Sequence, residues 1–100
     1  MFDLLKITGF DWDQGNARKN EKHGVSMAEA EEVFFNVPLL LLEDIKHSRR
    51  EPRYHALGRT DNQRYLHVSF TLRQAGRMIR VISARDMHRK ERAIYEAKAS

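Results

Sequence analysis

The feature that most constrains this chain is the strict alternation of residues 64–73, RYLHVSFTLR. Four apolar side chains alternate with four polar or aromatic ones: Leu66, Val68, Phe70 and Leu72 against Tyr65, His67, Ser69 and Thr71. Because successive side chains of a β-strand point to opposite faces, this pattern predicts a strand with one apolar face and one polar face.

Two more strands flank this one at the spacing of hairpins. Residues 53–60 precede it across a tight turn at Asp61–Asn62, and residues 77–85 follow it after a turn at Gln74–Gly76. Turn-forming residues between such segments favour neighbouring antiparallel strands, so the second half of the chain is predicted to form a three-stranded meander.

Helix signals lie on both sides of this meander. Asp13 is a candidate N-cap and Gly24 a candidate left-handed stop for a first, polar helix. Ser26 and Glu29 form a capping box for a second helix, which Asn36 and Pro38 end. A third helix is predicted to start at about His88.

These elements define the predicted fold class. A strand end at FDWD (10–13) precedes the helices, LLLLED (39–44) is predicted as a short buried strand, and residues 45–53 form a polar, basic connection. The sequence therefore predicts an α+β fold, with two N-terminal helices and a C-terminal helix packed on one face of a mostly antiparallel sheet.

Length and composition limit the class of protein. One hundred residues suit a single domain with one hydrophobic core. No apolar run approaches the roughly 18 residues of a membrane span. The absence of cysteine excludes disulfides and thiol chemistry, and it fits the reducing cytoplasm, where we expect the protein.

The charges divide the chain into an acidic part and a basic part. Residues 1–45 hold four Lys or Arg against nine Asp or Glu, whereas residues 46–92 hold thirteen against four. Twelve of the 18 basic residues are arginine, whose planar guanidinium can donate two parallel hydrogen bonds to a phosphate. The basic part favours a polyanion such as RNA or DNA, or an acidic protein; a solvated surface is the alternative.

Five stretches of the sequence resemble the BrnT family of bacterial type II toxins. They are FDWD (10–13), KHGVS (22–26), AEEVFFN (30–36), LGRT (57–60) and IRVISAR…RKER…Y (79–95). The resemblance covers nearly the whole chain, from about residue 10 to residue 96, and implies one BrnT-like toxin domain over residues 1–100.

The resemblance also implies a fold and a function. The family shares the RelE-like ribonuclease fold, so we expect a metal-independent endoribonuclease that cleaves RNA, arrests bacterial growth and uses no cofactor. The expected partner is a BrnA-type ribbon-helix-helix antitoxin, usually encoded next to the toxin. Operator DNA is then bound only through the antitoxin complex.

Two positions depart from the family pattern. The family often has Tyr-Gly-Glu before an arginine, and this chain has RREPR (49–53), which keeps Glu51 and Arg53. Family members commonly have Thr at the position of His88, as N-cap of the last helix. Here, either Asp86 caps that helix or His88 takes part in catalysis.

Metal-independent RNA cleavage needs cations on the phosphate as charge builds there. Arg80 and Arg85 are the best candidates, with ion pairs to acids of the first half as the alternative. Their odd spacing puts them on opposite faces of a regular strand, so a bulge must intervene if both reach one phosphate. Arg53 and Arg59 are further catalytic candidates because both match the family.

The same reaction needs a base for the 2′-hydroxyl and an acid for the leaving 5′-oxygen, and Glu51 and His55 are the candidates. Neighbouring arginines should lower the pKa of Glu51, which makes it an available but weak base; a solvated loop salt bridge is the alternative. The sequence shows no HExxH motif, paired carboxylates or other metal-ligand spacing.

Further RNA contacts are predicted for seven residues: Trp12, Lys22, His23, Arg64, His67, His88 and Arg89. Several have a structural alternative. Trp12 either stacks on a base or packs in the core, and His23 either contacts RNA or closes a helix. The alternative for Arg64 is a surface role. The alternatives for His67 are a group that titrates near neutral pH and a hydrogen-bonded surface histidine.

Three functions therefore compete for this sequence. The first is a toxin ribonuclease, and the second is a non-catalytic basic module that grips RNA, DNA or the ribosome. The third, compatible with the first, treats the basic face chiefly as a dock for an antitoxin segment that folds on binding.

Overall fold

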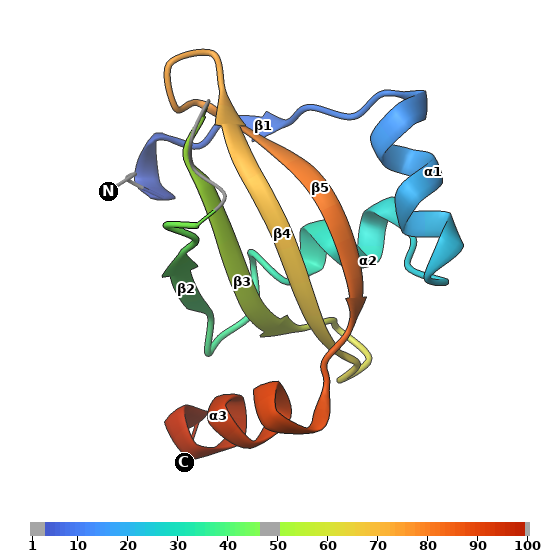
Figure 1. Cartoon of the computed structure of the whole chain (residues 1–100), viewed down its shortest axis with the longest axis vertical. Coiled ribbons are helices and arrows are strands. Elements are labelled where there is room, and N and C mark those ends of the chain that lie inside the picture. The colour runs from blue at the N-terminus through green and yellow to red at the C-terminus, as the bar shows by residue number, and fades with distance from the viewer. Residues whose placement is uncertain (1–3, 47–50, 100) are drawn as a thin grey trace.

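The computed structural model of the chain describes residues 4–46 and 51–99. The described residues form a five-stranded sheet in the order β1-β5-β4-β3-β2 (Figure 1). Its strands are β1 (Gly9–Phe10), β2 (Leu40–Glu43), β3 (Arg53–Arg59), β4 (Tyr65–Arg73) and β5 (Met78–Asp86). A 3-10 turn, η1 (Leu4–Lys6), precedes them, and the helices are α1 (Gln14–Lys22), α2 (Met27–Glu32) and α3 (Arg89–Ala99).

The predicted meander is confirmed. β3 pairs antiparallel with β4, and β4 pairs antiparallel with β5, through the turns expected from the sequence. β1 lies on the other side of β5 and runs parallel to it, with Gly9 opposite Met78. The α+β class is therefore correct, and the sheet is mixed because the chain passes through both helices before the meander begins.

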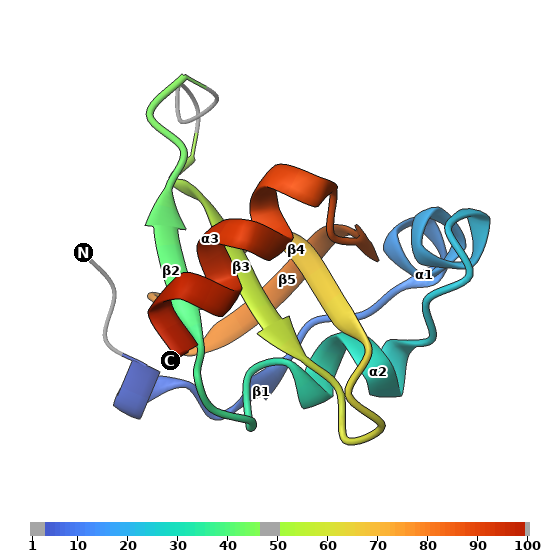
Figure 2. The same ribbon diagram turned by 90° about the horizontal axis from the view of Figure 1, so that it is seen from below.

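The helices do not all pack on one face of the sheet, so that expectation is wrong. Ala30 and Phe34, from α2 and the turn after it, join the core with Val68 and Phe70 of β4. α3 instead meets residues of the opposite parity, since the ring of Tyr95 lies 5.2 Å from that of Tyr65. Figure 2 shows α2 and α3 on opposite sides of the sheet. Alternation in β4 thus separates a core face from a polar face.

The helix caps follow the sequence signals. The Asp13 carboxylate accepts the backbone N–H groups of Gly15 and Asn16 at the start of α1. Gly24 adopts a φ of 69° after the helix, in the left-handed region where glycine has no steric cost. Ser26 and Glu29 form the complete capping box at the start of α2. These local rules were sufficient to place both helix starts.

α2 ends earlier than predicted, at Glu32, and residues 33–35 continue as tight turns. The N–H of Phe34 bonds to Glu31 O and that of Phe35 to Glu32 O, so the last turn tightens to three residues. Here the chain touches β3: a Cβ added to Gly58 would lie 2.7 Å from Val33 Cγ1. Contact with the strand accompanies the change from α-helix to tight turns.

The prediction of a buried strand in residues 39–44 is also wrong in its burial. β2 pairs only with β3, at the edge of the sheet, and Leu41 and Leu42 are exposed. Four consecutive leucines resemble a core strand in sequence, but an edge strand is covered on one side only. Of the basic connection after β2, residues 47–50 lie outside the described part of the chain.

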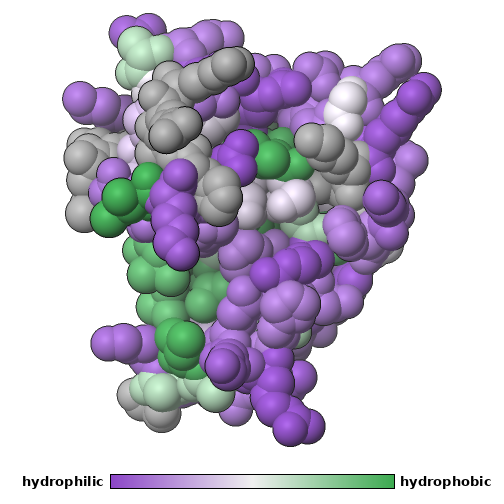
Figure 3. Space-filling model, viewed as in Figure 1, coloured by the Kyte–Doolittle hydropathy of each residue, from purple (hydrophilic) through white to green (hydrophobic). Residues whose placement is uncertain are grey.

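On the polar face, His67, Ser69 and Thr71 of β4 are buried, whereas Arg53, His55 and Arg80 of the flanking strands are partly exposed. Figure 3 shows hydrophilic residues over most of this side, with a hydrophobic strip over β2. Among the described residues, no helix has both the length and the apolar character needed to cross a membrane. The polar face therefore presents the candidate catalytic side chains of the meander.

Candidate active site

A β-bulge brings the two principal arginines of β5 to the same face. Ser69 pairs with Ser83 while the next residue, Phe70, pairs with Val81, so Ile82 has no residue opposite it. This extra residue reverses the parity, and both Arg80 and Arg85 stand opposite polar-face residues of β4. The bulge that their odd spacing requires is therefore present, and both arginines can reach the same face.

The register arranges the polar face in rows across three strands. Arg53, Thr71 and Arg80 form one row, and His55, Ser69 and Ser83 form the next. Neighbouring strands lie about 4.8 Å apart, which places the Cα atoms of Arg53 and Arg80 roughly 10 Å from each other. Arg53 and Arg80 thus lie on either side of Thr71, and His55 lies in the next row.

His55 is the best-positioned acid–base group on this face. Its Nε2 lies 2.8 Å from Asp44 Oδ2, and its Nδ1 lies 3.1 Å from Ser69 Oγ. The His55 side chain is 27% exposed and that of Asp44 is 10% exposed. The carboxylate therefore fixes the ring in one orientation while part of the imidazole remains accessible to solvent.

His67 lies beside His55 but plays a different part. The two ring centroids are 4.8 Å apart. Burial, with a further contribution from Arg85, lowers the pKa of His67 to about 4, and within the described residues its Nδ1 has no hydrogen-bond partner. His67 is thus neither an exposed residue nor a group that titrates near neutral pH, because β4 lies at the centre of the sheet under α3.

Arg80 is held by acids from the first half of the chain. Its Nη2 donates to Asp13 Oδ2 at 2.8 Å, and Nη1 lies 3.5 Å from Asp11 Oδ1. A hydrogen bond from the Asn16 N–H and the charge of Arg80 lower the pKa of Asp13, so this carboxyl is ionised. A hollow of about 220 Å³ beside Arg80 is lined by Gly15 and Asn16 at the start of α1.

Arg85 is paired more completely than Arg80. It donates to both carboxylate oxygens of Glu91, at 2.8 and 2.9 Å, in a fork-to-fork arrangement. Arg85, with the N–H of His88 contributing, lowers the pKa of Glu91 to about 2. This pair joins β5 to α3, so Arg85 is already occupied in fixing the helix.

The remaining catalytic candidates lie near the ends of β3. Glu51 forms an ion pair with Arg73 of β4, the salt bridge that was its structural alternative. Arg59 donates to Gln63 Oε1 at 3.0 Å across the β3–β4 turn, at the opposite end of the strand. The structure therefore gathers Arg53, His55 and Arg80, and it does not bring Arg59 to them.

Two of the predicted RNA contacts have clear structural roles. Trp12 packs against the core, and its Nε1 donates to Glu31 Oε2 at 2.7 Å. Arg64 donates to Asp86 and Glu29 and to the carbonyl of Gly24, which ties three segments together. Core packing is thus confirmed for Trp12, and the Arg64 guanidinium is engaged by the chain itself.

The other predicted RNA contacts lie on exposed ends of helices. Lys22 and His23 are exposed at the end of α1, and Arg89 is exposed at the start of α3. His88 precedes that helix, and its backbone N–H donates to Glu91 Oε1 at 2.9 Å. The alternative that Asp86 caps α3 is wrong, because Asp86 is the last residue of β5 and lies three residues before the helix begins. Its carboxylate pairs with Arg64.

Two members of the site, Asp44 and Ser69, are not among the catalytic residues that the sequence predicts. In the sequence, Asp44 only ends an apolar segment and Ser69 only lies on the polar face of a strand. The signal for Asp44 was available in the hairpin-like order of the chain, since an acid that follows β2 faces the first residues of β3. Among the described residues, no group of three or more His, Asp or Glu side chains converges as a metal site would require.

Comparison with known proteins identifies the family of the chain. The family model described as "Ribonuclease toxin, BrnT, of type II toxin-antitoxin system" matches residues 12–91. The comparison with curated proteins finds no match. The matched segment contains α1, α2, the whole sheet except β1, and the start of α3. The family acts on RNA and is paired with a protein antitoxin. This chain therefore belongs to the BrnT family of ribonuclease toxins of type II toxin–antitoxin systems.

Proposed function

We propose that this protein is a metal-independent endoribonuclease whose active site is the polar face of β3, β4 and β5. The observation that carries the proposal is the imidazole of His55, held between Asp44 and Ser69 and partly open to solvent. An imidazole oriented by a carboxylate on one nitrogen is a recurrent acid–base arrangement.

In the proposed reaction, His55 acts as the general base. Asp44 accepts the N–H of Nε2, which leaves the lone pair on Nδ1 to take a proton. In the free protein, Ser69 Oγ is the hydrogen-bond partner of Nδ1, and the 2′-hydroxyl of RNA would take the place of Ser69 there. The deprotonated 2′-oxygen attacks the phosphorus, the bond to the 5′-oxygen breaks, and water protonates the leaving group. The products are a 2′,3′-cyclic phosphate and a 5′-hydroxyl end.

Arg53 and Arg80 are proposed to hold the phosphate. They lie on opposite sides of Thr71 in the row next to His55. In the free protein, Arg80 forms an ion pair with Asp13, whose side chain is more than half exposed. A phosphate can therefore displace the Asp13 carboxylate from Arg80 at a small cost in desolvation. Arginines fixed on strands meet the developing charge without a large reorganisation, which is how such donors accelerate phosphoryl chemistry.

The first experiment tests catalysis and metal independence together. Purified protein incubated with RNA in EDTA should yield 2′,3′-cyclic phosphate ends. His55→Ala should lower kcat by roughly 10²–10⁴-fold, the usual contribution of a positioned acid or base. Glu21→Ala is the control, because it removes an exposed side chain near the end of α1 that is not among the predicted catalytic or RNA-binding residues. Activity that disappears in EDTA and returns with added metal would refute metal independence.

A second candidate function is a basic RNA-binding module without catalysis. The ion pair between Glu51 and Arg73 favours it, because it occupies one of the two candidate acid–base groups. Arg80→Ala separates the two functions. Under the catalytic proposal, kcat falls much further than RNA affinity; equal losses in turnover and affinity identify plain binding.

The finer features of the family complete the proposal. We place the chain in a single RelE-like toxin domain that arrests bacterial growth in the cytoplasm and is neutralised by a BrnA-type ribbon-helix-helix antitoxin. The family match, which spans four-fifths of the chain, supports this proposal. An adjacent reading frame that encodes a small ribbon-helix-helix protein is the expected genomic finding.

A further inference from the structure

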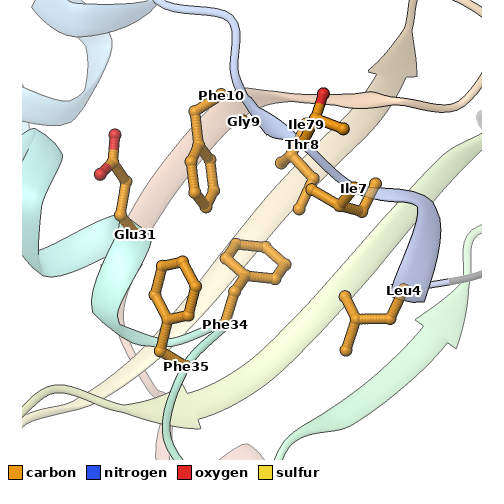
Figure 4. A pocket seen from close by; sticks show the side chains of 9 residues that line it. All are labelled: Leu4, Ile7, Thr8, Gly9, Phe10, Glu31, Phe34, Phe35 and Ile79. Atoms are coloured by element: carbon orange, nitrogen blue, oxygen red, sulfur yellow. The ribbon is translucent and has the colours of Figure 1, made fainter.

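An apolar groove lies on the core side of the molecule, away from the polar face. It is formed by Leu4 and Ile7 near η1, by Phe10 of β1, and by Glu31, Phe34 and Phe35 at the end of α2. Its volume is about 430 Å³, within the range of roughly 300–1,000 Å³ typical of binding pockets. Figure 4 shows the three phenylalanine rings on one side and the two aliphatic side chains facing them.

The groove exposes apolar surface that the described residues do not cover. Phe35 is 76% exposed, and Val37, two residues further on, is 73% exposed. The Phe35 ring stands 6.1 Å from that of Phe10, whose other neighbour is the buried ring of Phe34. A solvent-exposed phenylalanine continuous with a concave aromatic surface is typical of an interaction site.

The rim of this groove on the α2 side is acidic. α2 carries Glu29, Glu31 and Glu32 and no basic residue. Glu31 is fixed at the rim by the hydrogen bond from Trp12. Within the described residues, Glu31 has no cation within ion-pair distance. Glu32 does not line the groove and accepts the N–H of Asp61, and Glu29 is paired with Arg64. The occupant therefore needs apolar side chains for the groove and basic side chains beside them.

This charge pattern selects among the possible occupants. RNA is disfavoured because its phosphates would approach the carboxylates of α2. A second copy that docked symmetrically through Phe35 would set Glu31 near the same residue of its partner, and like charges at an interface are unfavourable. A basic amphipathic protein segment satisfies both the apolar and the charged parts of the surface.

We infer that this groove docks a basic amphipathic helix of the antitoxin, on the side of the sheet opposite His55. The inference depends on the toxin–antitoxin assignment, and it adds a second contact region to any masking of the active site. Helix-in-groove binding inserts apolar side chains spaced at three and four residues, and a flanking Lys or Arg would meet Glu31.

The first test uses a synthetic amphipathic helix with leucines on one face and lysines beside them. Its matched control carries glutamates in place of the lysines. Because the only tryptophan, Trp12, bonds to Glu31 at the rim, its fluorescence reports binding directly. The lysine peptide should bind more tightly, and Phe35→Ser should weaken its binding by at least about tenfold. Equal binding of the two peptides would overturn the inference.

Two variants of the chain keep this test specific. Ile45→Ser is the matched control for Phe35→Ser, because Ile45 is an apolar residue that is 83% exposed outside the groove. His55→Ala should bind the peptide as tightly as the parent does. Loss of RNA cleavage therefore leaves the docking result intact, and loss of docking leaves the catalytic proposal intact.

The second test uses the complete antitoxin, co-expressed with the chain. Phe35→Ser should reduce its co-purification, whereas Ile45→Ser should not. Equal recovery of antitoxin with Phe35→Ser and with the parent would overturn the assignment. The chain alone could also form a concentration-dependent dimer that Phe35→Ser abolishes. That result would show that a second copy of the chain binds the groove, and it would overturn the inference.

Discussion

At the residue scale, ion pairs fix the positions of three of the arginines. Arg80 meets Asp13, Arg64 meets Glu29, and Arg85 meets Glu91. The acidic first half is thus used partly to position the basic second half. Since partly exposed pairs contribute only about 0–1 kcal/mol each, their main effect is to fix side-chain geometry.

His67 gives a pH prediction at the same scale. Burial lowers the pKa of His67 to about 4 in the folded protein, below its ordinary value of 6.5. Between these values the unfolded chain binds a proton that the folded chain does not, so stability is lost as the pH falls. Between pH 7 and pH 5, the free energy of unfolding should drop by about 2 kcal/mol from this residue.

Urea unfolding at pH 7 and pH 5 measures this drop. His67→Gln should remove most of it, whereas His88→Gln, which changes an exposed histidine, should leave it in place. The window avoids the carboxyls, because the pKa values of Glu91 and Asp13 are lowered and these groups are ionised at both pH values. An unchanged pH dependence in His67→Gln would contradict the assignment.

At the element scale, the turn after α2 and β3 are packed at a distance that only glycine allows. A Cβ on Gly58 would lie 2.7 Å from Val33 Cγ1 and 3.2 Å from Val33 O. Gly58→Ala should therefore cost about 1–3 kcal/mol of stability, the range for overpacking. Combining it with Val33→Ala should cost at least about 0.5 kcal/mol less than the two single changes together, because the clash with Cγ1 is removed. Additive values in urea unfolding would contradict this contact.

α3 is attached to the sheet mainly through Tyr95. This buried residue donates its hydroxyl hydrogen to the carbonyl of Pro38 at 2.6 Å. Tyr95→Phe should cost about 1 kcal/mol, the usual contribution of one hydrogen bond, and Tyr95→Ala about 3–5 kcal/mol. Ile94→Ala, next to it and half exposed, should change stability by less than about 0.5 kcal/mol. Denaturant midpoints of the three variants test whether Tyr95 anchors the helix.

At the scale of the whole molecule, the two sides of the sheet carry different interactions. The polar face holds His55 with Arg53 and Arg80, and the core side holds the apolar groove beside α2. An antitoxin that binds the groove with one segment can mask the polar face with another. Two linked contacts then bind more tightly than either alone, because the second is formed at a high effective concentration.

RNA binding by the polar face should depend on salt. If about three phosphates are neutralised, the slope of log K against log salt is about −2, and affinity falls roughly twentyfold between 50 and 200 mM salt. Arg80→Ala should make this slope shallower by about 0.7, the share of one phosphate on a single strand. Filter binding over a salt series measures the slope. An unchanged slope in the variant would show that Arg80 does not contact a phosphate.

Much of the fold was determined by the sequence itself. The alternation of residues 64–73, the turns at 61–62 and 74–76, and the capping box at Ser26 and Glu29 are local signals, and each element formed where they placed it. Such signals depend on backbone sterics and on hydrogen bonds between residues a few positions apart. These local signals therefore depend little on the rest of the chain.

Tertiary structure alone decided which residues meet. The bulge at Ile82 set Arg80 and Arg85 on one face, and the pairing of β2 with β3 brought Asp44 to His55. The burial that lowers the pKa of His67 likewise depends on tertiary packing, in which Glu91 of α3 lies 3.9 Å from its Nε2. Strand register, the choice of face for each helix and burial depend on packing between distant segments, and no local pattern in the sequence specifies them.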